Sequence, residues 1–324
     1  MRQRLVLYGT LLWSAVYGAL GVHWWSGGGG FPFGDPRAET GMSLFTGVTA
    51  QAMAPFLAVG CAAGALVAAG ALWWRPMPAR LVAGFGWVAG PTLLFVLPDV
   101  RLLQNLAYAL GGHFGLVDWP VLNQLVCVAG GALWAGAALR AAPVRTPSAD
   151  WRRIGRWATA VAGVAPLPYG IQRAAWSAGI PLGVDEAYVA ALLADFDAKG
   201  MTGVTAYMLP LACLGGSLLT LGLAQRWGRV FPGRLPLLGG RAVPEALAVV
   251  PASLVTVAVT VAGLASWRSS LGTGMAHFAT GGVGLLWLPW GLALGLATLA
   301  YHHVRRLEGP AGGRALPTYA GRWR

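Results

Sequence analysis

Long apolar segments are the feature that most constrains the fold of this chain. The hydrocarbon core of a membrane is about 30 Å thick, and a helix needs about 20 apolar residues to cross it. Only 10% of the 324 residues are charged, whereas a soluble domain averages about 25%. We therefore expect an all-α integral membrane protein with eight transmembrane helices. The eight apolar segments lie near 4–25, 48–73, 80–98, 119–140, 157–178, 203–225, 244–266 and 281–303.

The distribution of arginine predicts the orientation of the chain. With eight spans, 18 of the 22 arginines fall on the side that carries the two termini. The other side holds four arginines, the single lysine and most of the acidic residues. Because positive residues are enriched in cytoplasmic loops, both termini are predicted to be cytoplasmic. The excess of arginine over lysine indicates a GC-rich genome, so we expect a multi-pass protein of a bacterial plasma membrane.

The net charge of +12 does not indicate a nucleic-acid partner. The arginines form short clusters between apolar segments instead of covering one soluble face, which is the pattern of a membrane protein. Membrane lipids are therefore the expected partners. The sequence leaves open a homo-oligomer or a protein partner.

The two halves of the chain repeat one pattern of residues in the same order. A Tyr-Gly pair is followed by a tryptophan, and a later apolar segment carries Met-x-Pro followed by glycine. Four spans per copy return the chain to the same side, so the pattern predicts two parallel four-helix repeats. The matched residues are Tyr17, Gly18, Trp24, Met53, Pro55 and Gly60 in one copy and Tyr169, Gly170, Trp176, Met208, Pro210 and Gly215 in the other. The predicted parts are a first repeat at 1–140, a cytoplasmic linker at 141–156, a second repeat at 157–307 and a disordered cytoplasmic tail at 308–324.

Arg173 is the sharpest single signal in the sequence. It lies inside an apolar segment, where an arginine costs at least about 2.5–3.5 kcal/mol at mid-bilayer. Tyr169, Gln172 and Trp176 share its helix face at spacings i, i+3, i+4 and i+7. The arginine either snorkels to the head groups or faces protein or a cavity. We predict that these four residues bind a ligand.

The first copy differs from the second at this face. Tyr17 and Trp24 match Tyr169 and Trp176, but Gly21 takes the place of Arg173. One binding site between two similar halves would produce this difference, and loss of an unneeded charge from one copy explains it equally well. We include Tyr17 and Trp24 among the predicted ligand-binding residues.

An acidic loop follows the fifth apolar segment. A loop that folds back would bring Asp185 or Glu186 to Arg173, where either carboxyl could act as a general acid. The Asp195-Phe-Asp197 triplet resembles acidic pairs that hold Mg²⁺, but a lone pair of this kind favours a solvated loop. The longer acidic motifs of prenyltransferases and terpene synthases do not occur.

The sequence predicts no cofactor and favours no metal. His23, His113 and His277 all fall on the predicted outer side, and three histidines can in principle bind Zn²⁺ or Cu²⁺. Their spacing shows no paired-ligand motif, which favours histidines that pack in loops. The three cysteines lie inside apolar segments without a paired spacing, as expected for small packing residues.

Two stretches of the second half resemble uncharacterised polytopic membrane proteins of GC-rich bacteria. One is Tyr169, Trp176 and Gly179, and the other is Arg226-Trp227-Gly228-x-Val230-Phe231-Pro232. The resemblance implies a multi-pass fold and no particular activity.

Three hypotheses for function follow. The first is a protein with an outward-facing polar and aromatic cavity that binds or transports a small or amphiphilic molecule. The second is a membrane enzyme, for example a cyclase or transferase, that acts on a lipidic or isoprenoid substrate with Glu186 or Asp185 as general acid. The third is a structural or assembly partner in the membrane.

Overall fold

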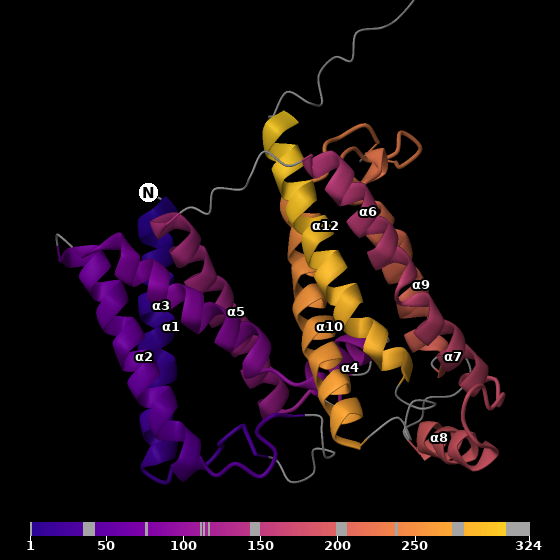
Figure 1. Ribbon diagram of the computed structural model, residues 1–324, viewed down its shortest axis with the longest axis horizontal. Helices are drawn as coiled ribbons and strands as arrows, with labels where there is room; N and C mark the ends of the chain where they lie inside the picture. Colours follow the sequence, from indigo (N-terminus) through magenta and orange to yellow (C-terminus); the bar gives the residue numbers. More distant parts are fainter. Residues whose placement is uncertain are drawn as a thin grey trace, which may run out of the picture. The chain divides into compact units, whose positions relative to one another are not determined.

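All of the named secondary-structure elements in the part of the chain that the structure, a computed structural model, describes are helices (Figure 1). That part comprises residues 2–34, 43–74, 77–110, 112, 114–115, 117–142, 150–198, 206–236, 239–273 and 282–308. The α-helices are α1 (Arg2–Trp25), α2 (Ala50–Trp73), α3 (Ala79–Pro91), α4 (Val100–Leu110), α5 (Trp119–Ala141), α6 (Trp151–Val164), α7 (Leu167–Ser177), α8 (Glu186–Ala198), α9 (Met208–Leu221), α10 (Glu245–Thr273) and α12 (Trp287–Glu308). The π-helix η1 (Thr92–Val96) continues α3, and η3 (Arg226–Gly228) and η5 (Gly282–Leu286) are 3-10 helices.

Six helical segments of the described residues are long and apolar enough to cross a membrane. They are Arg4–Trp25, Ala50–Trp73, Ala79–Val96, Trp119–Ala141, Glu245–Leu271 and Gly282–Leu307. Large apolar side chains on them face outwards, for example Leu12 at 67% and Phe56 at 79% exposure. Such side chains are costly in water but not in hydrocarbon. The prediction of a helical, multi-pass membrane protein is therefore supported.

Two of the eight predicted segments do not form one long helix. The segment predicted at 157–178 consists of α6 and α7, which are separated by Ala165 and Pro166. Proline disrupts a helix because it has no backbone N–H to donate and its ring clashes with the preceding turn, and Pro166 lies at this break. Pro168 lies in the first turn of α7, where a backbone N–H has no partner within the helix and its loss costs nothing. The segment predicted at 203–225 contains α9, an apolar helix of 14 residues.

The first of two compact units comprises residues 1–147 and 260–281. In it α1 packs along α2, and α3 packs along α5. Small residues allow these close approaches: a Cβ on Gly21 would lie 2.8 Å from the backbone nitrogen of Ala58, and one on Gly86 would lie 2.7 Å from the carbonyl oxygen of Trp134. Helices in lipid gain their stability from this kind of close packing.

The second unit comprises residues 148–259 and 282–324. Here α6 packs along α12, and α7 packs along α9. The loop after η3 is attached to the end of α12. Tyr301 donates to the carbonyl of Gly228, and Arg305 donates to those of Arg229 and Val243. His302 of α12 pairs with Glu245 at the start of α10.

The predicted division into repeats, linker and tail remains a prediction. Helix α5 ends at Ala141 and α6 begins at Trp151, so residues 151–156 of the predicted linker at 141–156 belong to α6. Residues 143–149 and the tail from 309 onwards lie outside the described residues.

Candidate functional site

Arg173 lies among aromatic side chains of its own helix, as its spacing predicts. Its Nε donates a hydrogen bond of 2.9 Å to the hydroxyl of Tyr169. The guanidinium carbon lies 5.3 Å from the ring centre of Tyr169 and 5.2 Å from that of Trp176. These are cation–π distances, so both rings stabilise the charge. The structure therefore brings together three of the four residues of the predicted stripe, and their binding of a ligand remains a prediction.

The chain folds back over the end of α7. Trp176 is 2% exposed, and its indole N–H donates to the carbonyl of Leu182 at 3.0 Å. Its ring meets Tyr188 of α8 edge-on at 5.2 Å. Gln172, the fourth residue of the stripe, is buried at 6% exposure. The turn between α7 and α8 thus shields one end of the stripe.

Asp185 and Glu186 are both exposed where α8 begins. The carboxylate of Asp185 accepts a hydrogen bond of 2.7 Å from the backbone N–H of Tyr188. This is the contact of a helix N-cap, and it gives Asp185 a structural role that the sequence reasoning did not assign. A catalytic role for either carboxyl remains a prediction.

Tyr17 and Trp24 lie in the core of the first unit, each 1% exposed. The hydroxyl of Tyr17 donates to the Oδ1 of Asn123 at 2.9 Å and lies 3.3 Å from the Sγ of Cys127. Trp24 packs edge-on against Tyr17 and against Phe31. The contacts of Tyr17 connect α1 to α5, and those of Trp24 connect α1 to the segment that follows it, so both residues have a packing role in this unit. Their binding of a ligand remains a prediction.

The difference between Gly21 and Arg173 has a structural cause in the first unit. Helix α1 approaches α2 so closely at Gly21 that any side chain there would meet the backbone of Ala58. At the matching position of α7, Arg173 is only partly buried and reaches its own aromatic neighbours. Gly21 is therefore a packing contact, whereas Arg173 presents a cationic group.

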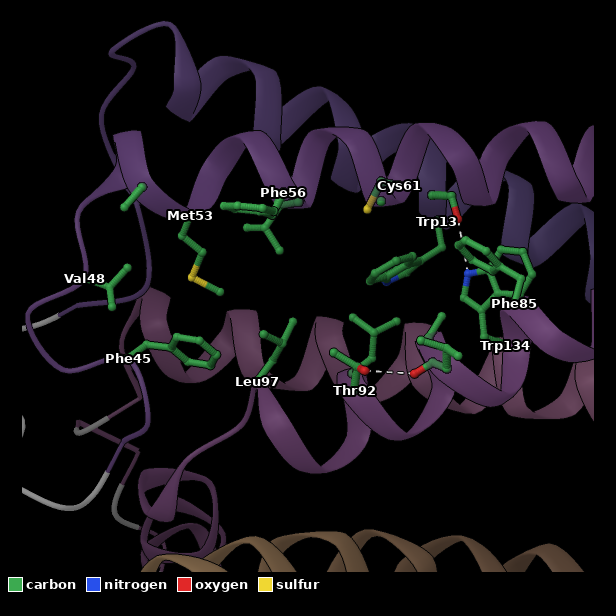
Figure 2. A pocket seen from close by; sticks show the side chains of 17 residues that line it. Trp13, Phe45, Val48, Met53, Phe56, Cys61, Phe85, Thr92, Leu97 and Trp134 are labelled. Carbon is green, nitrogen blue, oxygen red and sulfur yellow. Dashed lines mark hydrogen bonds between the residues drawn. The ribbon is translucent and has the colours of Figure 1, made fainter.

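A groove between α2 and α3 was not predicted from the sequence. It has a volume of about 520 Å³ and is lined almost entirely by apolar side chains (Figure 2). They come from α1, α2, α3, η1 and α5, from the segment before α2 and from Leu97 after η1. Figure 2 shows Phe45 and Val48 towards one end, Phe85 and Trp134 towards the other, and the ring of Trp13 between them. The lining residues are Trp13, Ser14, Phe45, Val48, Ala52, Met53, Phe56, Leu57, Gly60, Cys61, Phe85, Val88, Ala89, Thr92, Leu93, Leu97 and Trp134.

The groove is open on one side of the first unit. Phe56 of α2 and Val88 of α3 line it and are 79% and 70% exposed. A Cβ placed on Gly60 would meet nothing within 4 Å, so the lining has free space there. The few polar groups in the lining have partners: Trp134 donates to the hydroxyl of Ser14 at 3.3 Å, and Thr92 donates to a backbone carbonyl.

A polar cluster begins two residues after Leu97. Asp99 is 4% exposed, and its carboxylate accepts hydrogen bonds from both Nε and Nη2 of Arg101 at 2.9–3.2 Å. Gln124 of α5 donates to the same carboxylate at 2.8 Å. The pairing of Asp99 with Arg101 compensates both charges close to an apolar region.

The sequence contained two signals for this cluster. Pro98-Asp99 ends an apolar segment, and Asn123-Gln124 places two amides near the start of another. Neither signal specifies that the two polar pairs meet, because Asp99 and Gln124 lie 25 residues apart. Asp99, Arg101 and Gln124 are the site residues that the sequence reasoning missed.

The metal hypothesis remains untested. Within the described part of the chain, no group of three or more His, Cys, Asp or Glu residues could hold a metal ion. His23 is exposed at the end of α1, and His113 and His277 lie outside the described residues.

Comparisons with known proteins assign no family. No family model, curated protein or solved structure matches this chain.

Proposed function

We propose that this multi-pass membrane protein binds an elongated amphiphilic molecule and holds its apolar chain in the groove between α2 and α3. The observation that carries the proposal is the groove itself, which has an apolar lining and an open side between Phe56 and Val88. A site that opens sideways can exchange its occupant with the bilayer without passing it through water.

The dimensions of the groove favour a chain-like occupant. Along α2 the lining runs from Ala52 to Cys61, about 14 Å at a rise of about 1.5 Å per residue. Aromatic rings of Trp13, Phe45 and Phe85 add flat apolar walls. An alkyl or isoprenoid chain fits such an elongated space better than a compact polar molecule does.

The polar cluster supplies a reason why an amphiphile would be selected. Bulk lipid is as apolar as the groove, so apolar burial alone gives little preference for one occupant. Asp99 and Arg101 lie just beyond the lining residue Leu97 in the chain, and Gln124 of α5 binds the carboxylate of Asp99. Charged and amide groups that a polar head could approach therefore lie close to Leu97. The alternative of an enzyme that uses Asp185 or Glu186 rests on the sequence alone.

We also propose that the chain crosses the membrane eight times, as two parallel repeats with both termini in the cytoplasm. In this arrangement α6 and α7 together form a broken fifth span, and the 206–225 region around α9 contributes the sixth. A similar helix contact in each unit supports the repeat. A Cβ on Gly18 would lie 3.1 Å from the Cβ of Cys61, and one on Gly170 would lie 3.0 Å from that of Cys213.

A substitution that fills the groove tests the binding proposal. Gly60→Leu places a side chain in free space, so we expect the protein to fold and to lose affinity for an uncharged amphiphile by at least about tenfold, the effect of about 1.4 kcal/mol. The probe is tritiated hexadecanol, measured by scintillation proximity on protein in detergent, with farnesol as the isoprenoid competitor.

The matched control is Gly215→Leu at the corresponding repeat position. A Cβ on Gly215 also meets nothing within 4 Å, but this residue lies in the other unit. We expect the control to bind like the wild type. Equal binding by all three proteins would contradict the proposal.

A further inference from the structure

The second unit contains a group of hydrogen-bond donors, Arg173, Trp287 and Trp290, that is separate from the Asp99 cluster of the first unit. It lies where α7 packs against η5 at the start of α12. Arg173 is held by the rings of Tyr169 and Trp176, and Tyr169 meets the ring of Trp287 edge-on at 5.1 Å. The aromatic surroundings of Arg173 therefore extend from α7 to α12.

Two indole N–H groups on this part of α12 are buried without a partner. The Nε1 atoms of Trp287 and Trp290 are inaccessible, and neither makes a hydrogen bond within the described part of the protein. Trp290 is 8% exposed as a whole residue. The two tryptophans are three residues apart and so lie on the same side of the helix. Native structures rarely leave buried donors unpaired, so each of these needs an explanation.

The donors share one chemical preference. An indole nitrogen can only donate a hydrogen bond, and a guanidinium carries five N–H groups and accepts none. Arginine also binds carboxylate and phosphate groups through two parallel hydrogen bonds. A negatively charged oxygen ligand would satisfy the indoles and could accept a further hydrogen bond from the guanidinium.

We propose that Arg173, Trp287 and Trp290 form a binding site for an oxyanion, a carboxylate or a phosphate group. The site is separate from the groove between α2 and α3 and does not depend on it. Tyr169 and Trp176 position the guanidinium, and the tryptophans of α12 provide the additional donors. The oxyanion comes either from a lipid head group or from a free anion.

The test uses the full chain in nanodiscs of phosphatidylcholine and measures the thermal unfolding midpoint. One arm adds inorganic phosphate or acetate, and the other replaces part of the lipid with phosphatidylglycerol. We expect the midpoint to rise in at least one arm. A rise with phosphate or acetate identifies a free anion, and a rise with phosphatidylglycerol alone identifies a lipid head group.

Three variants test whether the anion raises the unfolding midpoint by binding at this site. Arg173→Gln should weaken the response by about tenfold or more in apparent affinity, because it removes a charge-assisted contact. Trp290→Phe and Trp287→Phe keep a ring and remove one donor, so each should weaken it by about threefold or more. These two substitutions remain informative if Arg173→Gln does not fold.

The control is Trp227→Phe, which removes an indole that donates to Gln225 outside this site. It should respond like the wild type. The proposal is overturned if no anion raises the midpoint, or if the wild type and the Arg173, Trp287 and Trp290 variants respond equally. Binding of uncharged hexadecanol should not change in Arg173→Gln, which separates this site from the groove.

Discussion

Gln124 holds Asp99 at two points. Its amide nitrogen donates to the carboxylate of Asp99 at 2.8 Å, and its amide oxygen accepts the backbone N–H of Asp99 at 3.2 Å. One side chain of α5 therefore fixes both the backbone and the carboxylate at the junction between η1 and α4. Arg101 binds the same carboxylate, so the orientation of both charges depends on Gln124.

Replacing Gln124 should destabilise the first unit. Gln124→Leu has similar bulk but leaves the backbone N–H of Asp99 without its partner and removes one of the hydrogen bonds to the Asp99 carboxylate, which costs about 1–3 kcal/mol. Asp99→Ala should cost more, about 3 kcal/mol or above, because it removes the carboxylate that pairs with the partly buried Arg101. Thermal unfolding in detergent measures both effects.

The control for this pair is Gln51→Leu, which removes an exposed glutamine from α2. It should leave the unfolding midpoint close to that of the wild type. A Gln124→Leu protein as stable as the control would show that the two contacts with Asp99 contribute no net stability.

The close approach of α1 and α2 makes Gly21 sensitive to a single methyl group. Gly21→Ala places a Cβ 2.8 Å from the backbone nitrogen of Ala58, so the helices must separate, at a cost of about 1–3 kcal/mol. Gly84→Ala on α3 adds the same methyl group in open space and should have no such cost. Similar unfolding midpoints for the two variants would rule out close packing at Gly21.

The number of spans can be tested at a single position. On a background without Cys61, Cys127 and Cys213, a cysteine introduced at Ala187 lies on the outer side if the chain crosses eight times. If only the six long helices cross, the same residue lies inside. All of the test positions are exposed, so labelling reports on topology and not on burial.

We expect a membrane-impermeant maleimide to label Ala187→Cys and Gly29→Cys in intact cells. Gly233→Cys should react only after permeabilisation, because it lies in a predicted cytoplasmic loop. If the cysteine at 187 is labelled only after permeabilisation, like that at 233, the chain crosses the membrane six times and the proposal of eight spans is wrong.

Hydropathy and charge predicted most of the long helices to within a few residues. The segments predicted at 4–25, 48–73 and 119–140 correspond to α1, α2 and α5, because an uninterrupted apolar run leaves the backbone no partner in lipid except itself. The prediction at 157–178 missed the break between α6 and α7. Pro166 and Pro168 were signals for that break that we did not use.

The groove could not be predicted in the same way. Its lining comes from several elements, and in a membrane protein an apolar residue such as Phe56 or Val88 has the same pattern whether it faces lipid, core or groove. The separation of α2 and α3 that creates the space is a tertiary property. The Arg173 stripe was recognisable in the sequence because a charged residue in an apolar segment is rare. The indole N–H groups of Trp287 and Trp290 could be identified as lacking a hydrogen-bond partner only from the three-dimensional structure.

The most direct test of the account is to find where an apolar chain lies on the protein in a membrane. A diazirine-bearing hexadecanol is activated by light, and its adducts are located by mass spectrometry. We predict adducts concentrated at Met53, Phe56 and Leu93, which are lost in Gly60→Leu and retained in Gly215→Leu. Adducts spread evenly over lipid-facing residues outside the groove, such as Leu66 and Leu81, and unchanged by Gly60→Leu, would contradict a binding groove between α2 and α3.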